Sequence, residues 1–459
     1  MKNVKFKRVF SFVLALVMVI TLAPAAFASL PPEGAETTDM HSAWAQEDVF
    51  LAQSVFRLGN EGTFSNFRGG MAAQKFAPLY ESLRLALGSE RGFISANERL
   101  TRGEVIFAFY GLMYETAPTI AEAADYFIAN GLLLGRAADD YQLDGIITVE
   151  ETIALAVRVF YHGSYLTGNY STGFFWEVQG LANTVWLLGS VHIADASVYP
   201  FSKAIEQAFA RSANLAIEAD VFGMSEEEEA FYMAMAFIDP ESGSTIADHI
   251  SEETYSLYAE VFEALGLTAE FYDYLRPWSA YSLLEVLLMI GGDADALDDS
   301  MEMGIDLHFI MRALASGKNI IQLESVEFQV EMLSSLSDEL QEYLLLSTLL
   351  NAFPSEDEEE ETTDYAGLFQ KILESVRTGD EAVIAGLLVD ETDDPLLVEF
   401  SEILLLQRDI AMTQKIAEFL RSPADNGNYF VVVGTAHFIG ENSIVGQLTE
   451  MGFTVERVR

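Results

Sequence analysis

The stretch from Thr184 to Asp220 reads TVWLLGSVHIADASVYPFSKAIEQAFARSANLAIEAD, and it decides the fold expected for the chain around it. An apolar run at 185–188 is followed by an amphipathic segment at 199–211 and by a second apolar run at 215–217. This order is typical of a strand, a crossover helix and a parallel strand. The stretch therefore predicts an α/β domain built on a largely parallel sheet.

Polar residues follow the apolar runs at the points where the strands should end. The first run leads into GSVH, which contains His192, and the second leads into Glu218. A distant run at 429–433 leads into GTAH, which contains His437. Because ligands bind beyond the carboxyl ends of parallel strands, we expect the three side chains to face one crevice. In both GxxH sequences we expect the glycine to let the backbone turn sharply where the strand stops.

Two imidazoles and one carboxylate form a ligand set for a divalent metal ion with open coordination positions. Water bound to such an ion loses a proton more easily and a bound carbonyl is polarised, which is the chemistry of hydrolysis. We therefore predict that His192, Glu218 and His437 bind a metal ion. The alternatives are a buried structural histidine at either position and, for Glu218, a carboxylate that caps a helix. The sequence contains no HExxH and no GxSxG, so neither the common zinc-protease helix nor a serine-hydrolase elbow is supported.

The first 28 residues have the pattern of a secretory signal peptide. Four basic residues precede an uncharged apolar run at 9–22, and the segment ends in Ala26-Phe27-Ala28. We predict cleavage after Ala28, a linker at 29–39 and an exported protein with no transmembrane segment after cleavage. A retained membrane anchor is the alternative, but the apolar run is short for a bilayer.

The composition excludes several classes of function. The chain contains 25 Lys and Arg, 71 Asp and Glu and no Cys among its 459 residues. Without the four basic residues of the predicted signal peptide, 21 basic residues remain and the formal net charge is 21 − 71 = −50. Such a charge repels nucleic-acid phosphates, so nucleic-acid binding is not expected. Without cysteine there are no disulfides or thiolate zinc sites, and a metal must be held by His and carboxylate.

Three helical segments between residues 40 and 165 resemble one another. They are MAAQKFAPLYESL from Met71, LTRGEVIFAFYGLM from Leu100 and ITVEETIALAVRVF from Ile147. Thr101 and Thr148 each stand three residues before a glutamate, which predicts capping boxes at the starts of two helices. The arrangement resembles S-layer homology (SLH) repeats, which begin a helix with Thr-Arg-x-Glu and bind the secondary polysaccharide of Gram-positive cell walls. The resemblance implies a wall-binding role for Arg102, and because only the middle copy keeps the arginine, a helical spacer is the alternative.

Residues 173–459 resemble the TraB/GumN family, which includes the bacterial pheromone-shutdown protein and the animal Tiki proteases. The resemblance is carried by five motifs in the family's order: 174–220, GID at 304–306, GKNIIQLESVEFQ at 317–329, QRDIAM at 407–412 and FVVVGTAHFIGENSIVGQLTEMGFTVERV at 430–458. It implies a mixed, largely parallel sheet flanked by helices, as in ChaN and erythromycin-esterase-like proteins. From the pattern, strands are expected near residues 174, 185, 215, 320, 430 and 454. Helical insertions at 220–317 and 330–420 should cover the crevice, and an acidic loop at 354–364 should be solvated.

Three further residues are assigned to the predicted site. Glu324 ends the apolar run at 320–323 as Glu218 ends its own, so it is expected to serve as ligand, base or orienter. The resemblance implies a place near the pocket for Asp306 and Arg408, where Arg408 could hold an oxyanion or neutralise surplus acid. A structural salt bridge is the alternative for both. The other histidines are expected to be structural or exposed: His41, His162, His249 and His308.

The combined prediction is a secreted, wall-associated metallohydrolase that cleaves a peptide or a related amide. The resemblance to Tiki proteases implies manganese or cobalt, and the His/carboxylate ligands also suit zinc or iron. The alternative from a different class is a non-catalytic envelope protein that binds a peptide signal, haem or a metal.

Overall fold

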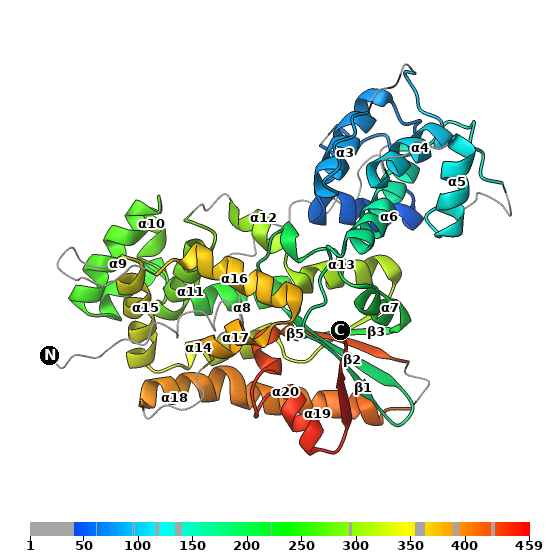
Figure 1. Cartoon of the computed structure of the whole chain (residues 1–459). Helices are drawn as coiled ribbons and strands as arrows, with labels where there is room; N and C mark the ends of the chain where they lie inside the picture. Colours follow the sequence, from blue (N-terminus) through cyan, green and yellow to red (C-terminus); the bar gives the residue numbers. More distant parts are fainter. Residues whose placement is uncertain are drawn as a thin grey trace. The chain divides into compact units, whose positions relative to one another are not determined.

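The computed structural model describes residues 41–459 except 61, 94, 96, 115–118, 134–139, 222, 293–295, 354–362, 389–393 and 424–426. The predicted signal peptide, the linker and most of the acidic loop lie outside the described residues. The chain divides into two compact units (Figure 1). Within the described residues, the first unit comprises 41–171 and 314–317, and the second comprises 172–313 and 318–459.

The first unit is helical. Its α-helices are α2 (Gln46–Phe50), α3 (Ala73–Ala86), α4 (Arg102–Met113), α5 (Ile120–Ala129) and α6 (Val149–Thr167). Both predicted capping boxes are confirmed, since Thr101 caps α4 and Thr148 caps α6, each with a glutamate at the third helical position.

The residues in front of α3, α4 and α6 are joined in a ring of backbone hydrogen bonds. The N–H of Met71 donates to Ile147 (2.8 Å), that of Ile147 to Leu100 (3.2 Å), and that of Leu100 to Met71 (3.0 Å). The three similar segments therefore meet around an approximate threefold axis at their helix starts.

The second unit is built on a six-stranded sheet in the order β4-β3-β5-β2-β1-β6. The strands are β1 (Phe175–Gln179), β2 (Thr184–Ser190), β3 (Asn214–Ile217), β4 (Asn319–Gln322), β5 (Tyr429–Gly434) and β6 (Thr454–Arg457). β4, β3, β5 and β2 are parallel neighbours, whereas β1 is antiparallel to both β2 and β6. All six predicted strands and the mixed, largely parallel fold class are confirmed.

Helices cover both faces of the sheet. Tyr429 and Phe430 are consecutive in β5, so their side chains point to opposite faces. Phe430 packs against Phe209 of α7 (Lys203–Arg211) and Phe309 of α13 (Ile305–Ser316), at ring centroid distances of 5.5 and 4.9 Å. Tyr429 stacks on Phe419 of α19 (Gln407–Arg421), at 4.4 Å. Burial on both faces explains why β3 and β5 read as unbroken apolar runs.

The crossover helix α7 begins later than the sequence pattern indicates. The amphipathic segment was expected from residue 199, but the helix starts at Lys203 because the side chain of Ser202 accepts a hydrogen bond from the N–H of Ile205 and caps it.

The two insertions are helical and share a core. The first contains α8 (Glu226–Ala236), α9 (Glu252–Ala264), α10 (Ala269–Tyr272), α11 (Pro277–Met289) and α12 (Ala296–Glu302), followed by α13. The second contains α14 (Val326–Ser334), α15 (Asp338–Ala352), α16 (Tyr365–Thr378), α17 (Glu381–Leu387) and α18 (Pro395–Ser401), followed by α19; α20 (Ile444–Glu450) lies between β5 and β6.

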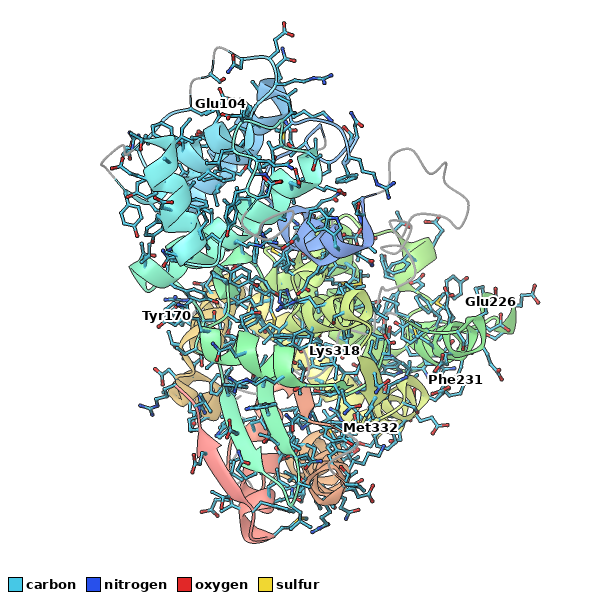
Figure 2. The ribbon with its side chains drawn as sticks, turned by 90° about the vertical axis from the view of Figure 1, so that its right-hand side faces the viewer. Glu104, Tyr170, Glu226, Phe231, Lys318 and Met332 are labelled. Carbon is cyan, nitrogen blue, oxygen red and sulfur yellow. The ribbon has the colours of Figure 1, made fainter. Side chains whose placement is uncertain are left out.

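The shared core of the insertions reaches the end of β5. Buried side chains such as Trp278 of α11 and Leu345 of α15 form this core, and Ala436, next to His437, belongs to it. The insertions therefore cover the carboxyl end of β5. Outside the core the insertions carry many acidic residues, such as Glu226, which projects into solvent from the first turn of α8 (Figure 2). None of the helices among the described residues is long and apolar enough to cross a membrane.

Candidate active site at the carboxyl ends of four strands

Four neighbouring parallel strands end at one edge of the sheet, and each is followed by a predicted site residue. In the β2–β5 register Ser190 pairs with Gly434, so His192 and His437 follow the ends of adjacent strands. β3 ends one residue before Glu218. Beyond β4, the N–H of Glu324 donates to the carbonyl of Glu218 (2.7 Å), which extends the β3–β4 pairing. The sheet therefore brings residues from four separate sequence segments to one edge.

Neither GxxH glycine adopts a positive φ. Gly434 has a φ of −48°, and Gly189 also lies outside the positive-φ region. A Cβ at Gly189 would lie 2.9 Å from both the Cβ of Phe174 and the Oγ1 of Thr435, so glycine permits close packing there. At Gly434 the backbone N–H donates to Oε1 of Glu218 (2.5 Å). Close approach therefore explains the glycine at 189, while β5 stops at Gly434 and a 3₁₀ helix begins at Thr435.

Arg408 lies at the centre of the site between two carboxylates. Its side chain is 0% exposed, and its Nη2 lies 2.6 Å from Oε2 of Glu218 and 2.7 Å from Oε2 of Glu324. Its Nε donates to both oxygens of Glu324 at 3.0 Å, and Nε2 of Gln329 in α14 donates to Glu324 at 3.0 Å. One buried guanidinium thus binds both strand-end glutamates.

The buried charges of this cluster shift one another's pKa values. Burial raises the pKa of Glu218, and Arg408 and His192 oppose that rise. Burial lowers the pKa of Arg408, but Glu324 and Glu218 outweigh burial and the net shift is upward. Arg408 therefore stays charged and favours the ionised form of Glu218.

Each histidine of the crevice is hydrogen-bonded through Nδ1 to an aspartate. Nδ1 of His192 lies 2.6 Å from Oδ2 of Asp306, in the first turn of α13, and Nδ1 of His437 lies 2.6 Å from Oδ1 of Asp409, in α19. A carboxylate at Nδ1 sets the ring orientation and leaves Nε2 as the atom that faces a ligand. Nε2 of His437 is buried and has no hydrogen-bond partner among the described residues, whereas the side chain of His192 is 18% exposed.

Burial shifts the pKa values of both members of the His437–Asp409 pair. Burial lowers the pKa of His437 well below its usual value, and the charges of Arg408 and His192 lower it further. Burial also raises the pKa of Asp409 to about 9, against the effect of Arg408. Burial therefore favours the neutral form of each group.

Sequence reasoning missed Asp409 and Gln329. Both lie within the quoted motifs, as the third residue of QRDIAM and the last residue of GKNIIQLESVEFQ. An aspartate next to Arg408 on a helix that also packs on the sheet was the available signal. A helix turns by about 100° per residue, so neighbouring residues can both face a broad interface.

Two other residues considered from the sequence, Arg102 and His308, are not part of the crevice. Arg102 belongs to the first unit, is 5% exposed, and its Nη2 lies 2.5 Å from Oε1 of Glu151. His308 is fully buried against the rings of Tyr199 and Phe201, with Nη1 of Arg312 3.2 Å from its Nε2. The side chain of Arg102 is thus turned into the unit, and His308 is a core residue.

No group of three or more His, Asp or Glu side chains in the described part of the chain is already arranged to hold a metal ion. At the predicted site the carboxylate of Glu218 is turned toward Arg408 and the N–H of Gly434. The two histidines and Glu218 nevertheless lie close enough for His192 to influence the pKa values of both His437 and Glu218.

Comparison with known proteins gives one match. No curated protein and no solved structure is significantly similar to the chain. The model of the TraB/PrgY/gumN family matches residues 174–457, a segment that contains the whole sheet and every residue of the crevice. Since this match covers more than half of the chain, the protein belongs to the TraB/PrgY/gumN family.

Proposed function

We propose that this protein is a metal-dependent hydrolase of peptides or related amides, with the metal bound by Nε2 of His192, Nε2 of His437 and the carboxylate of Glu218. The observation that carries the proposal is the pair of histidines on adjacent strands, each with an aspartate on Nδ1. Metal-binding histidines characteristically donate their other ring N–H to a carboxylate, which fixes the tautomer and strengthens the ligand. The donor set contains no sulfur and suits manganese, cobalt, iron or zinc.

The residues of the crevice fit this role. The buried Nε2 of His437 lacks a hydrogen-bond partner among the described residues, and a ligand there would satisfy it. Glu218 already accepts from Arg408 and Gly434, but two carboxylate oxygens offer about four lone-pair positions. Glu218 can therefore keep both contacts and still act as a ligand.

The roles of the other residues follow from their contacts. A bound divalent ion would supply a water that deprotonates near neutral pH and a Lewis acid for the carbonyl. Glu324 is held by Arg408 and Gln329, so we assign it to orienting the cluster rather than to proton transfer. Arg408 is enclosed by carboxylates, so we assign it to charge neutralisation. Asp306 and Asp409 orient the two histidines.

Metal content tests the proposal. The purified chain is dialysed against Mn²⁺, Co²⁺ or Zn²⁺, freed of excess metal and measured by elemental analysis. We expect one ion per chain in the wild type and none in the His192→Ala/His437→Ala double variant. His249→Ala, which removes an exposed histidine far along the chain from the crevice, is the matched control and should bind like the wild type.

Equal metal content in the double variant and the wild type would refute the proposed site. A peptide library then separates hydrolysis from binding: chelator-sensitive cleavage that the double variant lacks supports the hydrolase. Stoichiometric metal without any cleavage would instead favour the non-catalytic binding protein.

We also propose that the chain is exported and that its first unit attaches to a cell-wall polysaccharide. The N-terminal sequence pattern supports export, and the ring of hydrogen bonds among three similar helix starts supports an SLH-like unit. A cavity of about 300 Å³ in this unit is lined by Arg91, Phe93, Asn97 and Glu104, a mixture of ring and polar groups suited to a sugar. Because Arg102 is buried against Glu151, we assign the glycan contact to Arg91 instead.

Sedimentation with purified Gram-positive cell walls tests attachment. The wild type should sediment with walls, and Arg91→Ala should reduce the bound fraction several-fold because a cation in the cavity is lost. Arg68→Ala removes an exposed arginine of the same unit outside the cavity and should leave binding unchanged. If the wild-type chain stays in the supernatant, the attachment proposal is refuted and the first unit is a spacer.

A further inference from the structure

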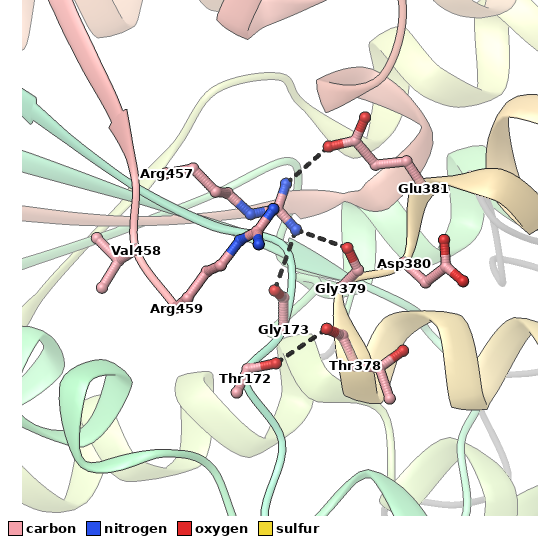
Figure 3. Close-up of a pocket in the computed structure, with 9 residues that line it drawn as sticks. All are labelled: Thr172, Gly173, Thr378, Gly379, Asp380, Glu381, Arg457, Val458 and Arg459. Carbon is pink, nitrogen blue, oxygen red and sulfur yellow. Dashed lines mark hydrogen bonds and ion pairs between the residues drawn. The ribbon is translucent and has the colours of Figure 1, made fainter.

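A second cavity lies in the sheet-containing unit, at the start of β1 and the end of β6 (Figure 3). Its volume is about 550 Å³, and it is lined by residues 172–173, 378–381 and 457–459. It has no part in the proposed chemistry. Its lining brings together two arginines, Arg457 and Arg459, in a chain whose formal net charge is −46.

Arg457 is held rigidly in the wall of this cavity. Its guanidinium lies 4.2 Å from the ring centroid of Trp176 and 5.0 Å from that of Phe174. Its Nη2 donates to the carbonyls of Gly379 (3.0 Å) and Gly173 (3.3 Å), and its Nη1 lies 3.0 Å from Glu381. An arginine fixed in this way loses little side-chain entropy when it binds a ligand.

Arg459 lines the same cavity (Figure 3), and it is near enough for its charge to act on Arg457. Burial lowers the pKa of Arg457, and the charge of Arg459 lowers it further while Glu381 opposes both. The side chain of Arg459 is exposed, and no ion pair to it occurs among the described residues.

The two carboxylates of the lining already have partners, and for one of them the partner is Arg457 itself. Glu381 pairs with Arg457, and Oδ1 of Asp380 accepts from the N–H of Ala382 at the start of α17. Two neighbouring guanidinium groups thus repel each other, and an anion shared between them would relieve the repulsion.

We propose that this cavity binds an oxyanion of the carboxylate or phosphate class between Arg457 and Arg459. The position of the cavity suggests where such an anion comes from. β1 begins beside the end of β2, with Phe175 paired to Leu188, and β6 ends beside the start of β1, with Arg457 paired to Trp176. The cavity therefore lies at the same edge of the sheet as the histidine crevice.

The spacing of strands gives the separation of the two sites. β6 is two positions from β2 in the sheet, and neighbouring strands are about 4.8 Å apart, so the cavity lies on the order of 10 Å from the end of β2. An extended chain covers this distance in about three residues. The C-terminal carboxylate of a peptide is therefore one source of the anion, a reading that rests on the proposed hydrolase, and a free small anion is the other.

Calorimetric titration of the full chain tests the proposal, with inorganic phosphate and with one N-acetylated tetrapeptide prepared with a free or an amidated C-terminus. We expect phosphate and the free-carboxylate peptide to bind, and Arg459→Ala to weaken both by about tenfold, because one charge-assisted contact is lost. Lys371→Ala, which removes an exposed cation of α16 outside the cavity, is the matched control. Thermal melting checks that each variant is folded.

Two comparisons decide the result. Tighter binding of the free-carboxylate peptide than of its amide supports a substrate end in the cavity, and phosphate binding with no difference between the peptides supports a free anion. Equal phosphate affinity for the wild type and Arg459→Ala, or no binding by the wild type, would overturn the proposal. Since these titrations need no metal, failure of the hydrolase proposal would leave them unchanged.

Discussion

Replacing Arg408 by alanine should lower the free energy of unfolding by about 3–5 kcal/mol, because Glu218 and Glu324 then stay buried without their common cation. Both carboxylates are at most 5% exposed, and Arg408 itself is 0% exposed, so water cannot take its place without local opening. Urea denaturation at pH 7 measures the loss. Arg377→Ala, which breaks an exposed pair with Glu374 on α16, is the control and should cost no more than about 1 kcal/mol.

The loss caused by Arg408→Ala should depend on pH. Burial already raises the pKa of Glu218, and without Arg408 it rises further. A carboxyl group with a raised folded-state pKa binds its proton more tightly in the folded protein than in the unfolded chain. Proton binding therefore stabilises the fold fully below the unfolded pKa of about 4.3, and this stabilisation is lost as the pH rises through the folded pKa. The deficit relative to the wild type should therefore be small near pH 4 (about the unfolded pKa) and grow toward alkaline pH.

Replacing the two buried glutamates by neutral glutamines is a second test of this cluster. Adding Glu218→Gln and Glu324→Gln to Arg408→Ala should restore part of the lost stability, since no uncompensated charge remains buried. A deficit that does not change with pH and does not exceed that of Arg377→Ala would show that the cluster is not an electrostatic unit.

Gly304→Ala should disturb both stability and the metal site. A Cβ at this position would overlap the carbonyl oxygen of His192 and lie 3.0 Å from the carbonyl carbon, and backbone atoms cannot rotate away. The N–H of Ile305 also donates to the carbonyl of Val191 (3.0 Å), so the two segments are in direct contact. Alanine should push α13 from the end of β2 and pull Asp306 from His192.

We expect Gly304→Ala to cost about 1–3 kcal/mol of stability, as overpacking usually does. Metal affinity should fall about 10–100-fold, because His192 loses its orienting carboxylate. Gly386→Ala is the matched control: it lies in α17 with nothing within 4 Å of the added Cβ, and alanine is favoured over glycine in a helix. Unchanged stability and metal content in Gly304→Ala would show that the contact between Gly304 and His192 is unimportant.

Much of the fold could be predicted because its signals are local. Apolar runs ending in glycine or a polar residue marked β2, β3, β4 and β5, and a threonine three residues before a glutamate marked the starts of α4 and α6. The parallel arrangement then placed His192, Glu218, Glu324 and His437 at one edge without any knowledge of side-chain contacts. The start of α7 was missed because a serine cap, rather than the amphipathic pattern, sets it.

The partners of the site residues could not be predicted in the same way. From the sequence, Arg408 could equally have bound a substrate anion or formed a structural salt bridge. That it lies between two glutamates depends on how α19 packs on the sheet. Asp409 and Gln329 were missed because each lies on a helix and contacts a residue that follows the end of a strand, and only the packing of helix on sheet shows those contacts.

The sequence by itself determined the order of strands and helices, the edge of the sheet at which the polar residues gather and the absence of cysteine ligands. These follow from periodicity, composition and the handedness of crossover connections. Only the tertiary structure decided which carboxylate meets each histidine, that Glu218 turns toward Arg408, that Arg102 is buried and that Arg457 and Arg459 share a cavity. The side-chain pairs among these contacts join residues that lie between 28 and 190 positions apart in the chain. They are set by how separate helices and strands pack, and no local sequence pattern encodes that packing.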